Sequence, residues 1–335
     1  MVPPTPEKPA ENPIEKLATS VYPAFALLAG MQLDLFTSLK DGPLDADKIA
    51  AKIDANADKL KVLLYSLVVA GFLDVEGELF SNTDITDRYL VKDSPECIVD
   101  IHDLLSTMWN AAIKSSESIR TGMPQAKINY SSMSKDDLRQ FFRGEHPYAL
   151  ESGRDLVKRF DFTSYSTLLD VGGGSGGTSI AVTEACPNIQ ATIMDLPLIT
   201  PVAQYYIEKA NAGNRINVIA TDVIHDPLPG SYDVAVMASF LQVLSAEDAN
   251  GAIKNVSKVI KPGGDIYIRG YGIIDDSRVS PQKNVEFNLV YINVYDEGQA
   301  YTEQEHKDWL EEAGFGEFKR TILPDGSSII KARKI

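Results

Sequence analysis

The fold is decided by the stretch Leu168-Leu169-Asp170-Val171-Gly172-Gly173-Gly174-Ser175-Gly176-Gly177. Its apolar start predicts a β-strand, and its glycines predict a loop that leads into a helix over residues 178–186. A second predicted strand, 190–194, ends at Asp195, whose carboxylate can accept hydrogen bonds from two ribose hydroxyls. Because glycines let the backbone approach a ligand closely, this pattern predicts a binding site for a nucleotide-like cofactor.

The spacing Gly172-x-Gly174-x-x-Gly177 also matches the dinucleotide fingerprint, so an NAD-dependent dehydrogenase is the first alternative. Asp170 argues against it, since a carboxylate at the strand end repels a pyrophosphate but can hold the ammonium group of an amino acid. A third predicted strand, 217–220, leads to Asp222, an acid placed for the exocyclic amine of an adenine. These acids favour a cofactor with a cationic end.

Two further predicted strands, 232–237 and 265–269, complete the pattern, the second after a Lys-Pro-Gly-Gly turn. With Asp170–Gly176 and Asp195-Leu196-Pro197, the chain resembles the class I S-adenosylmethionine (SAM) methyltransferases, specifically the acetylserotonin and caffeic-acid O-methyltransferase-like family, from about residue 14 to the end. The resemblance implies an α/β, doubly wound Rossmann-like sheet with an N-terminal helical winged-helix dimerisation domain. It implies SAM as cofactor, S-adenosylhomocysteine as product, and these cofactor-binding residues: Asp170, Gly172, Gly174, Asp195, Leu196, Asp222, Val223 and Ala238.

A length of 335 residues with 44% hydrophobic residues exceeds one ordinary domain. The expected parts are a disordered lead, 1–13, and a winged-helix dimerisation domain, 14–100. Linking helices over 101–160 are expected to roof a substrate pocket, and the SAM-binding domain is expected over 161–335.

Composition limits the partners of the chain. A net charge of −15 disfavours nucleic acid and anionic membranes, and no apolar stretch is long enough to span a bilayer. The two cysteines, Cys97 and Cys186, lie in separate contexts, which predicts a reducing compartment, the cytoplasm. Metal dependence is not expected, because His, Cys and carboxylates do not gather at ligand spacing.

The first hundred residues predict helices followed by a hairpin. Apolar residues recur at helical spacing over 17–28 and continue over 31–39, short helices follow over 49–53 and 60–67, and 73–80 alternates around a glycine turn. DNA binding is disfavoured, because the would-be recognition helix offers only Lys59 and Lys61 as cations. The resemblance implies a homodimer; a rigid lid without a dimer is the alternative.

The catalytic positions depart from the family. Related O-methyltransferases carry a Leu-His-Asp-Trp motif whose histidine removes the acceptor proton, whereas this chain has Leu241-Gln242-Val243-Leu244. An amide cannot act as a base near neutral pH. Two glutamates that orient the family's histidine are replaced by Arg269 and Ala300. These losses favour an acceptor that has no proton to lose, and a thioether sulfur fits best.

Arg269 in place of a glutamate also favours an acceptor that carries a carboxylate. The pattern resembles the S-methyltransferases of dimethylsulfoniopropionate synthesis and predicts S-methylation of 4-methylthio-2-hydroxybutyrate, with aromatic rings around the new sulfonium. The predicted catalytic residues are Gln242, Arg269 and Tyr148. The predicted small-molecule site adds Trp109, Arg143, His146, Tyr271, Tyr291, Tyr295 and Tyr301.

Three alternatives stay open. A relocated base, His146, would serve an ordinary hydroxyl or amine acceptor; His102, His225 and His306 are less favourably placed. The chain could also bind SAM without methylating, either in another reaction or as a non-catalytic dimer.

The C-terminal stretch predicts a helix over 302–313 that opens on a Thr302/Glu305 capping box, then an antiparallel hairpin over 318–332. A dehydrogenase with an all-parallel sheet edge would lack this hairpin.

Overall fold

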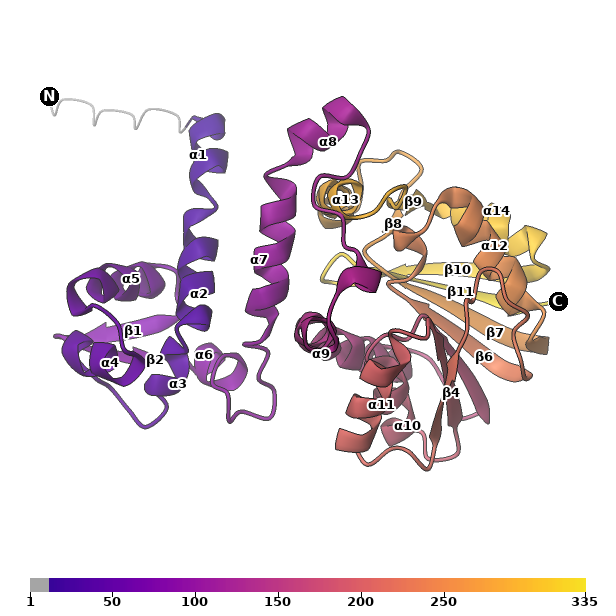
Figure 1. Cartoon of the computed structure of the whole chain (residues 1–335), viewed down its shortest axis with the longest axis horizontal. Helices are drawn as coiled ribbons and strands as arrows, with labels where there is room; N and C mark the ends of the chain where they lie inside the picture. Colours follow the sequence, from indigo (N-terminus) through magenta and orange to yellow (C-terminus); the bar gives the residue numbers. More distant parts are fainter. Residues whose placement is uncertain (1–11) are drawn as a thin grey trace, which may run out of the picture. The chain divides into compact units, whose positions relative to one another are not determined.

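The computed structural model describes residues 12–335, which form two compact units that divide after Leu105 (Figure 1). The predicted disordered lead therefore lies almost entirely outside the described residues. The predicted linking helices belong with the second unit from Ser106 onward.

The first unit is helical with one hairpin. Its elements are α1 (Pro13–Thr19), α2 (Tyr22–Gln32), α3 (Leu35–Ser38), α4 (Ala46–Ile53), α5 (Ala57–Val69), β1 (Leu73–Glu76), β2 (Leu79–Asn82) and α6 (Asp84–Tyr89). Phe36, Leu64 and Phe80 are buried in its core. The helical pattern predicted to continue through 31–39 is broken, because Asp34 adopts the left-handed conformation, φ 53°, between α2 and α3.

The second unit opens with four helical segments: α7 (Ile101–Ala112), which crosses the division, α8 (Ser115–Thr121), the 3-10 turn η1 (Tyr130–Ser132) and α9 (Lys135–Arg159). Ser134 and Asp137 form a capping box that fixes the start of α9. At 25 residues, α9 is long enough to cross a whole face of the domain.

A seven-stranded sheet follows, in the order β10-β11-β7-β6-β3-β4-β5. Its strands are β3 (Thr167–Val171), β4 (Gln190–Asp195), β5 (Ile216–Ala220), β6 (Tyr232–Ala238), β7 (Ile260–Gly270), β10 (Phe315–Ile322) and β11 (Ser328–Lys334). Neighbours from β5 to β7 are parallel, whereas β11 is antiparallel to both β7 and β10. This mixed sheet confirms the predicted fold class and the predicted antiparallel hairpin.

Helices cover both faces of this sheet (Figure 1). Alternation along β3 shows why: Leu168 packs with residues of α9, α10 (Gly177–Ala185) and α11 (Thr200–Lys209), whereas Leu169 packs with residues of α12 (Ala246–Ser257) and α14 (Glu303–Glu312). The remaining elements are the turn η2 (Leu241–Val243), α13 (Gln282–Val294) and the short pair β8 (Ile273–Ile274) and β9 (Tyr301–Thr302). The predicted capping box of Thr302 and Glu305 at the start of α14 is confirmed.

Candidate active site

The glycine loop follows β3 directly and is shaped for close approach. Gly172 and Gly174 have φ values of +62° and +55°, which side chains rarely adopt. A Cβ on Gly172 would lie 2.3 Å from the Phe240 ring, and one on Gly174 would lie 2.8 Å from the Phe142 ring. Both positions therefore require glycine.

Two carboxylates flank the loop. The Asp195 carboxylate accepts hydrogen bonds from the backbone N–H of Gly174, at 2.8 Å, and of Leu196, at 2.7 Å, so each of its oxygens retains a free lone pair. Asp170 is buried, and its Oδ2 accepts from the Ser179 hydroxyl at 2.7 Å. Its Oδ1 has no hydrogen-bond partner among residues 12–335.

A buried carboxylate oxygen without a donor is costly unless a ligand supplies one. Burial raises the pKa of Asp170 and of Asp195 to about 6 in the free protein. A cationic ammonium beside Asp170 and hydroxyls beside Asp195 would stabilise the ionised forms. The residues present therefore fit SAM, with its ammonium group and ribose.

The other predicted cofactor residues lie at neighbouring strand ends. Leu196 is partly exposed just after β4, and Ala238 is half-buried at the end of β6. Asp222 accepts from the backbone N–H of Ile224 and is paired with His225 Nδ1 at 2.9 Å. Val223 differs from the expectation: its side chain is buried in the core, so only its backbone remains for an adenine contact.

The helix α9 crosses directly over the glycine loop. A Cβ on Gly177 would lie 2.7 Å from Ala149 Cβ, and one on Gly153 would lie 2.6 Å from the Thr178 carbonyl oxygen. This close crossing of α9 and α10 fixes which residues of α9 face the loop. Phe142 lies against Gly174, and His146 Nδ1 is hydrogen-bonded to the Ser175 hydroxyl at 2.9 Å.

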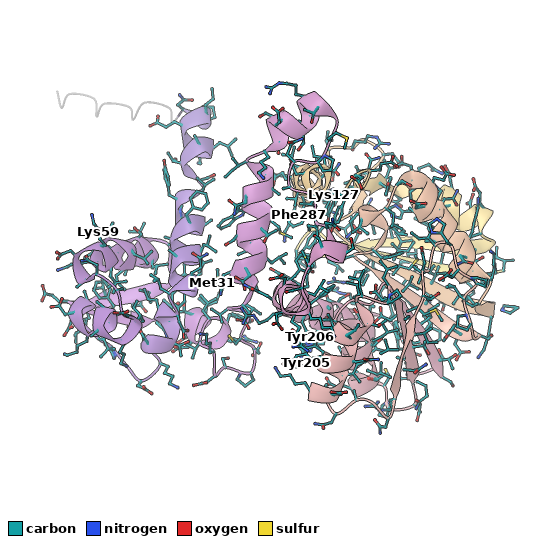
Figure 2. All side chains as sticks on the ribbon, in the orientation of Figure 1. Met31, Lys59, Lys127, Tyr205, Tyr206 and Phe287 are labelled. Carbon is teal, nitrogen blue, oxygen red and sulfur yellow. The ribbon has the colours of Figure 1, made fainter. Side chains whose placement is uncertain are left out.

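His146 has its Nδ1 engaged by Ser175, so the relocated-base hypothesis depends on its other ring nitrogen, Nε2, and stays a prediction. Its ring stacks on that of Tyr206 of α11, which is labelled in Figure 2, at a centroid distance of 3.8 Å. Burial, with Lys209 and Arg154 nearby, lowers the pKa of His146 to about 4. The neutral imidazole holds α9, the glycine loop and α11 together.

Two of the remaining histidines, His225 and His306, are hydrogen-bonded elsewhere. His306 is buried, its Nδ1 lies 2.8 Å from the Thr302 carbonyl oxygen, and burial lowers its pKa to about 4. His225 is exposed and paired with Asp222, while His102 lies 3.2 Å from Asp103 in α7.

Gln242 occupies the turn η2 beyond β6 and is tightly enclosed. A Cβ on Gly272 would lie 2.4 Å from Gln242 Cβ, and one on Gly298 would lie 2.6 Å from the Gln242 carbonyl oxygen. Ala300, on the same loop as Gly298, is fully buried. The position where related enzymes place a histidine therefore holds a buried amide.

The guanidinium of Arg269 is not free to bind the carboxylate of an acceptor, contrary to the prediction from the sequence. Its side chain, at the end of β7, is 9% exposed, and its Nη2 lies 2.9 Å from Asp155 Oδ2 of α9. Asp155 therefore already neutralises this guanidinium. The buried Nε of Arg269 has no hydrogen-bond partner within the described residues.

Aromatic rings line the face of α13. Phe287 and Tyr291 have centroids 5.7 Å apart, and Tyr291 and Tyr295 have centroids 6.2 Å apart, in steps of four residues (Figure 2 labels Phe287). The Tyr271 ring stacks on the Phe287 ring at a centroid distance of 5.6 Å. The predicted tyrosines 271, 291 and 295 are thus brought together.

The prediction that Tyr301 lines the small-molecule site is wrong. Tyr301 is 1% exposed, its ring packs against Trp309 at 4.9 Å, and its hydroxyl donates to the Leu244 carbonyl oxygen at 2.6 Å. This tyrosine is part of the core and cannot present its ring to an acceptor.

The other predicted site residues lie on two helices. Trp109 is half-buried on α7, Arg143 is exposed on α9, and Tyr148 is 42% exposed on α9. Sequence reasoning missed Glu145, which lies between Arg143 and Tyr148. Burial raises the pKa values of four tyrosines, and the negative charge of Glu145 adds to each shift: Tyr130, Tyr148, Tyr291 and Tyr295.

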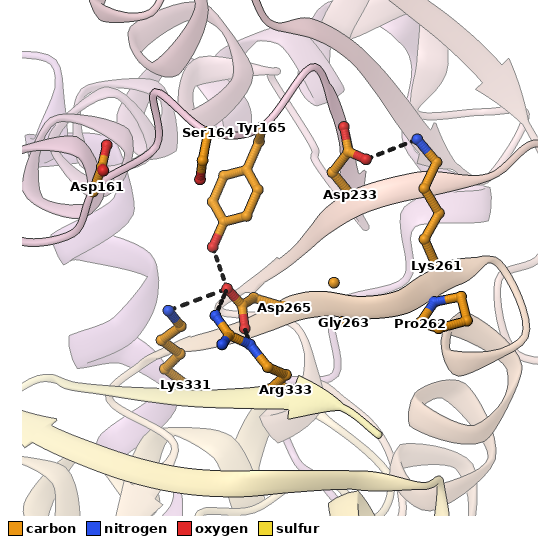
Figure 3. Close-up of a pocket in the computed structure, with 11 residues that line it drawn as sticks. Asp161, Ser164, Tyr165, Asp233, Lys261, Pro262, Gly263, Asp265, Lys331 and Arg333 are labelled. Atoms are coloured by element: carbon orange, nitrogen blue, oxygen red, sulfur yellow. Dashed lines mark hydrogen bonds and ion pairs between the residues drawn. The ribbon is translucent and has the colours of Figure 1, made fainter.

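A separate cavity of about 470 Å³ lies at the other edge of the sheet, where β3 and β6 begin (Figure 3). Asp265 there accepts from Tyr165 and from Arg333 Nε at 3.1 Å, and it is paired with Lys331 Nζ at 3.1 Å. Lys261 Nζ lies 2.7 Å from Asp233 Oδ1. Its cations are paired with its own carboxylates, so this cavity lacks the unpartnered groups of the glycine-loop edge.

Within residues 12–335, no three side chains of the metal-binding types gather to form a metal site. The same part of the chain contains no helix that combines the length and apolarity needed to cross a bilayer.

Family models match an O-methyltransferase domain over residues 114–316 and an O-methyltransferase dimerisation domain over residues 16–92. The 8-O-methyltransferase TcmO of tetracenomycin polyketide synthesis from Streptomyces glaucescens is 26% identical, with 96% of each chain covered. Acetylserotonin O-methyltransferase of Gallus gallus is 27% identical over 82% of this chain and 83% of its own. Human N-acetylserotonin methyltransferase, solved in complex with SAM, superposes with a TM-score of 0.85 at 23% identity, covering 98% of this chain and 99% of that chain. The chain belongs to the O-methyltransferase family and is a SAM-dependent methyltransferase.

Proposed function

We propose that this enzyme transfers a methyl group from SAM to a hydroxyl group of a small aromatic acceptor. The observation that carries the proposal is the position of α9. This helix lies across the glycine loop through His146 and Ala149, and its Glu145 lies within electrostatic reach of the tyrosines of α13. An aromatic wall with a carboxylate beside the cofactor loop is the environment that an aromatic hydroxyl acceptor requires.

The family supports the same acceptor class. Two similar enzymes are named for O-methylation, one in tetracenomycin polyketide synthesis and one for acetylserotonin. SAM, when bound, supplies an electrophilic methyl group. The protein contributes the enclosure of the acceptor between α9 and α13 and the exclusion of water from it.

A second candidate is S-methylation of a thioether acid such as 4-methylthio-2-hydroxybutyrate, as in dimethylsulfoniopropionate synthesis. The observation in its favour is Gln242, a buried amide at the usual position of the base. Ring faces of Tyr291 and Tyr295 near the charge of Glu145 would also stabilise a sulfonium product. The pairing of Arg269 with Asp155 weakens this candidate, because it removes the expected anchor for the acid.

The test is incubation of the purified enzyme with SAM and each of four acceptors: a hydroxynaphthoate, N-acetylserotonin, a catechol and 4-methylthio-2-hydroxybutyrate. S-adenosylhomocysteine and the methylated product are measured by mass spectrometry. We expect turnover with at least one hydroxyl acceptor. Turnover with the thioether alone would replace the proposal by the second candidate, and SAM binding without any product would favour the non-methylating alternative.

We also propose that the enzyme is a homodimer formed through its first unit. Large apolar side chains are exposed on its helices, among them Leu17 of α1 at 74%, Val62 of α5 at 69% and Val69 of α5 at 90%. Such a concentration of exposed apolar surface is typical of an interaction site. Light scattering after size-exclusion chromatography should give twice the mass of the chain, and Val62→Asp should shift the enzyme toward the monomer.

A further inference from the structure

Glu145 stands out among the acidic side chains near the glycine loop. It lies three residues after Phe142 and four before Ala149, so it shares the side of α9 on which those residues meet Gly174 and Gly177. Its side chain is half-buried, and its carboxylate has no hydrogen bond or ion pair to any residue that the structure describes. A carboxylate in this setting is available to a ligand.

Four phenols lie within electrostatic reach of Glu145. Tyr130 comes from η1, Tyr148 from α9 itself, and Tyr291 and Tyr295 from α13. The Tyr130 ring stacks on Phe142, which lies against Gly174, at a centroid distance of 6.5 Å. The carboxylate therefore lies within an aromatic enclosure that adjoins the glycine loop.

We propose that Glu145 is the general base that takes the proton of the acceptor hydroxyl, in place of the histidine that Gln242 replaces. This inference rests on the proposed O-methyl transfer. It also explains how a chain without a histidine at position 242 retains a proton acceptor beside the glycine loop.

The proton and electrons balance in this scheme. The acceptor O–H bond breaks, and its proton moves to the Glu145 carboxylate. The electron pair left on oxygen forms the new bond to the methyl carbon, while the bond from that carbon to the sulfonium sulfur breaks and its electron pair stays on sulfur. The products are the methyl ether, S-adenosylhomocysteine and a protonated Glu145, which then returns its proton to water.

The electrostatics of Glu145 fit this role. Burial raises its pKa to about 7, which brings a carboxylate into the range where a general base is most effective. The same burial raises the pKa values of Tyr130 and Tyr291 far above neutral, so these phenols stay protonated and uncharged beside it. Glu145 can therefore exchange a proton near neutral pH beside phenols that keep theirs.

The experiment compares Glu145→Gln with Glu151→Gln, a matched change of an exposed glutamate on the same helix. The hydroxyl acceptor is the one of the four-acceptor set that the unmodified enzyme methylates fastest. For Glu145→Gln we expect kcat to fall about 100-fold or more, the typical contribution of a general base. Calorimetry should give the same SAM dissociation constant for both variants and the unmodified enzyme, and Glu145→Asp should recover part of the activity.

The pH profile supplies an independent readout. In the unmodified enzyme kcat should rise through about pH 7 and then level off, and this limb should disappear in Glu145→Gln but persist in Glu151→Gln. A Glu145→Gln enzyme that keeps its kcat and its pH limb on a hydroxyl acceptor would overturn the role of Glu145 while leaving O-methyl transfer intact. If the unmodified enzyme methylates only the thioether, the proposed function fails, and the role of Glu145 as a base fails with it. Loss of SAM affinity in Glu145→Gln would instead assign the residue to cofactor binding and would also overturn the inference.

Discussion

Charged side chains at the two edges of the central sheet differ in whether they have hydrogen-bond or ion-pair partners. At the edge where β3 and β4 end, Asp170 Oδ1 and the Glu145 carboxylate have no partner in the described part of the chain. At the edge where β3 and β6 begin, Asp265 has three partners, and Asp233 accepts from two backbone N–H groups and pairs with a lysine. Unsatisfied charge marks the edge that binds ligands, whereas satisfied charge marks the edge that holds the fold together.

Electrostatics follow the same division. Burial raises the pKa values of Asp170 and Asp195, because hydrogen bonds at the ligand edge do not compensate for it. At the other edge burial also opposes ionisation of Asp265, but hydrogen bonds from Arg333, Tyr165 and Lys331 outweigh it and lower its pKa. The cavity at the edge where β3 and β6 begin is lined by paired charges. We assign the reaction to the other edge, where carboxylates lack partners.

The largest effect is expected from Asp265→Ala. It leaves Tyr165, Lys331 and Arg333 without their shared acceptor and should lower the free energy of unfolding by about 3 kcal/mol. Urea unfolding measures this loss, and Asp161→Ala, an exposed change on the same cavity, is the control with an expected loss under about 1 kcal/mol. The SAM dissociation constant of the Asp265 variant should not change at a temperature where it is folded; a weaker constant would break the comparison.

The second largest effect is expected at the ligand edge, on the affinity for SAM rather than on stability. Asp195→Ala removes a carboxylate that has room for two ribose hydroxyls, and hydrogen bonds to a charged group contribute about 1.5–3 kcal/mol each. We expect the SAM dissociation constant to rise about 100-fold or more, measured by calorimetry. Asp161→Ala again serves as the control. If Asp195→Ala bound SAM normally, the ribose would have to be held elsewhere.

The sequence predicts these two edges unequally well. Strand and helix positions follow from local patterns, such as the alternation of Leu168 and Leu169 and the capping box at Thr302, so the fold is predictable. The glycine loop and Asp195 are also adjacent through two neighbouring strands, and their roles follow from that order.

The acceptor side depends on contacts that no local pattern encodes. Arg269 meets Asp155 across 114 residues, which converts a predicted anchor into an internal ion pair. Glu145 of α9 is brought within electrostatic reach of Tyr295, at the end of α13, only by the tertiary fold. In the sequence itself, Glu145 is marked only as an acid among aromatic residues. Tyr301 has the same residue type as Tyr295, but its burial against Trp309 is decided by tertiary packing.

A smaller effect is expected from pH at the ligand edge. The pKa values of Asp170 and Asp195 are raised to about 6 in the free protein, so between their ordinary values and about pH 6 the folded state binds more protons than the unfolded state. These two groups should therefore stabilise the free enzyme as pH falls from 7 toward 4. Bound SAM favours the ionised forms, so its affinity should weaken below about pH 6, by up to about tenfold per pH unit for one group.

Calorimetry from pH 5 to pH 8 measures this dependence. Asp170→Asn removes one of the two titrating groups, so its SAM affinity should be lower at pH 8 and should depend less steeply on pH. An equally steep profile in this variant would show that Asp170 does not lose a proton when SAM binds.

The smallest effect is expected on stability, from an exposed ion pair at the edge where β3 and β6 begin. Lys261 is 44% exposed, so its ion pair with Asp233 is largely screened, and Lys261→Met should cost about 0.5 kcal/mol of stability in low salt and less in 1 M salt. Asp233 keeps the backbone N–H groups of Ser166 and Thr167, each at 2.8 Å, which join the start of β3 to β6 whether or not the lysine is present. Urea unfolding at both salt concentrations checks this. If Lys261→Met lost more than about 1.5 kcal/mol of the free energy of unfolding, the exposed lysine, and not the backbone donors, would keep Asp233 ionised. Stability at this edge would then depend on its surface charges rather than on its buried hydrogen bonds.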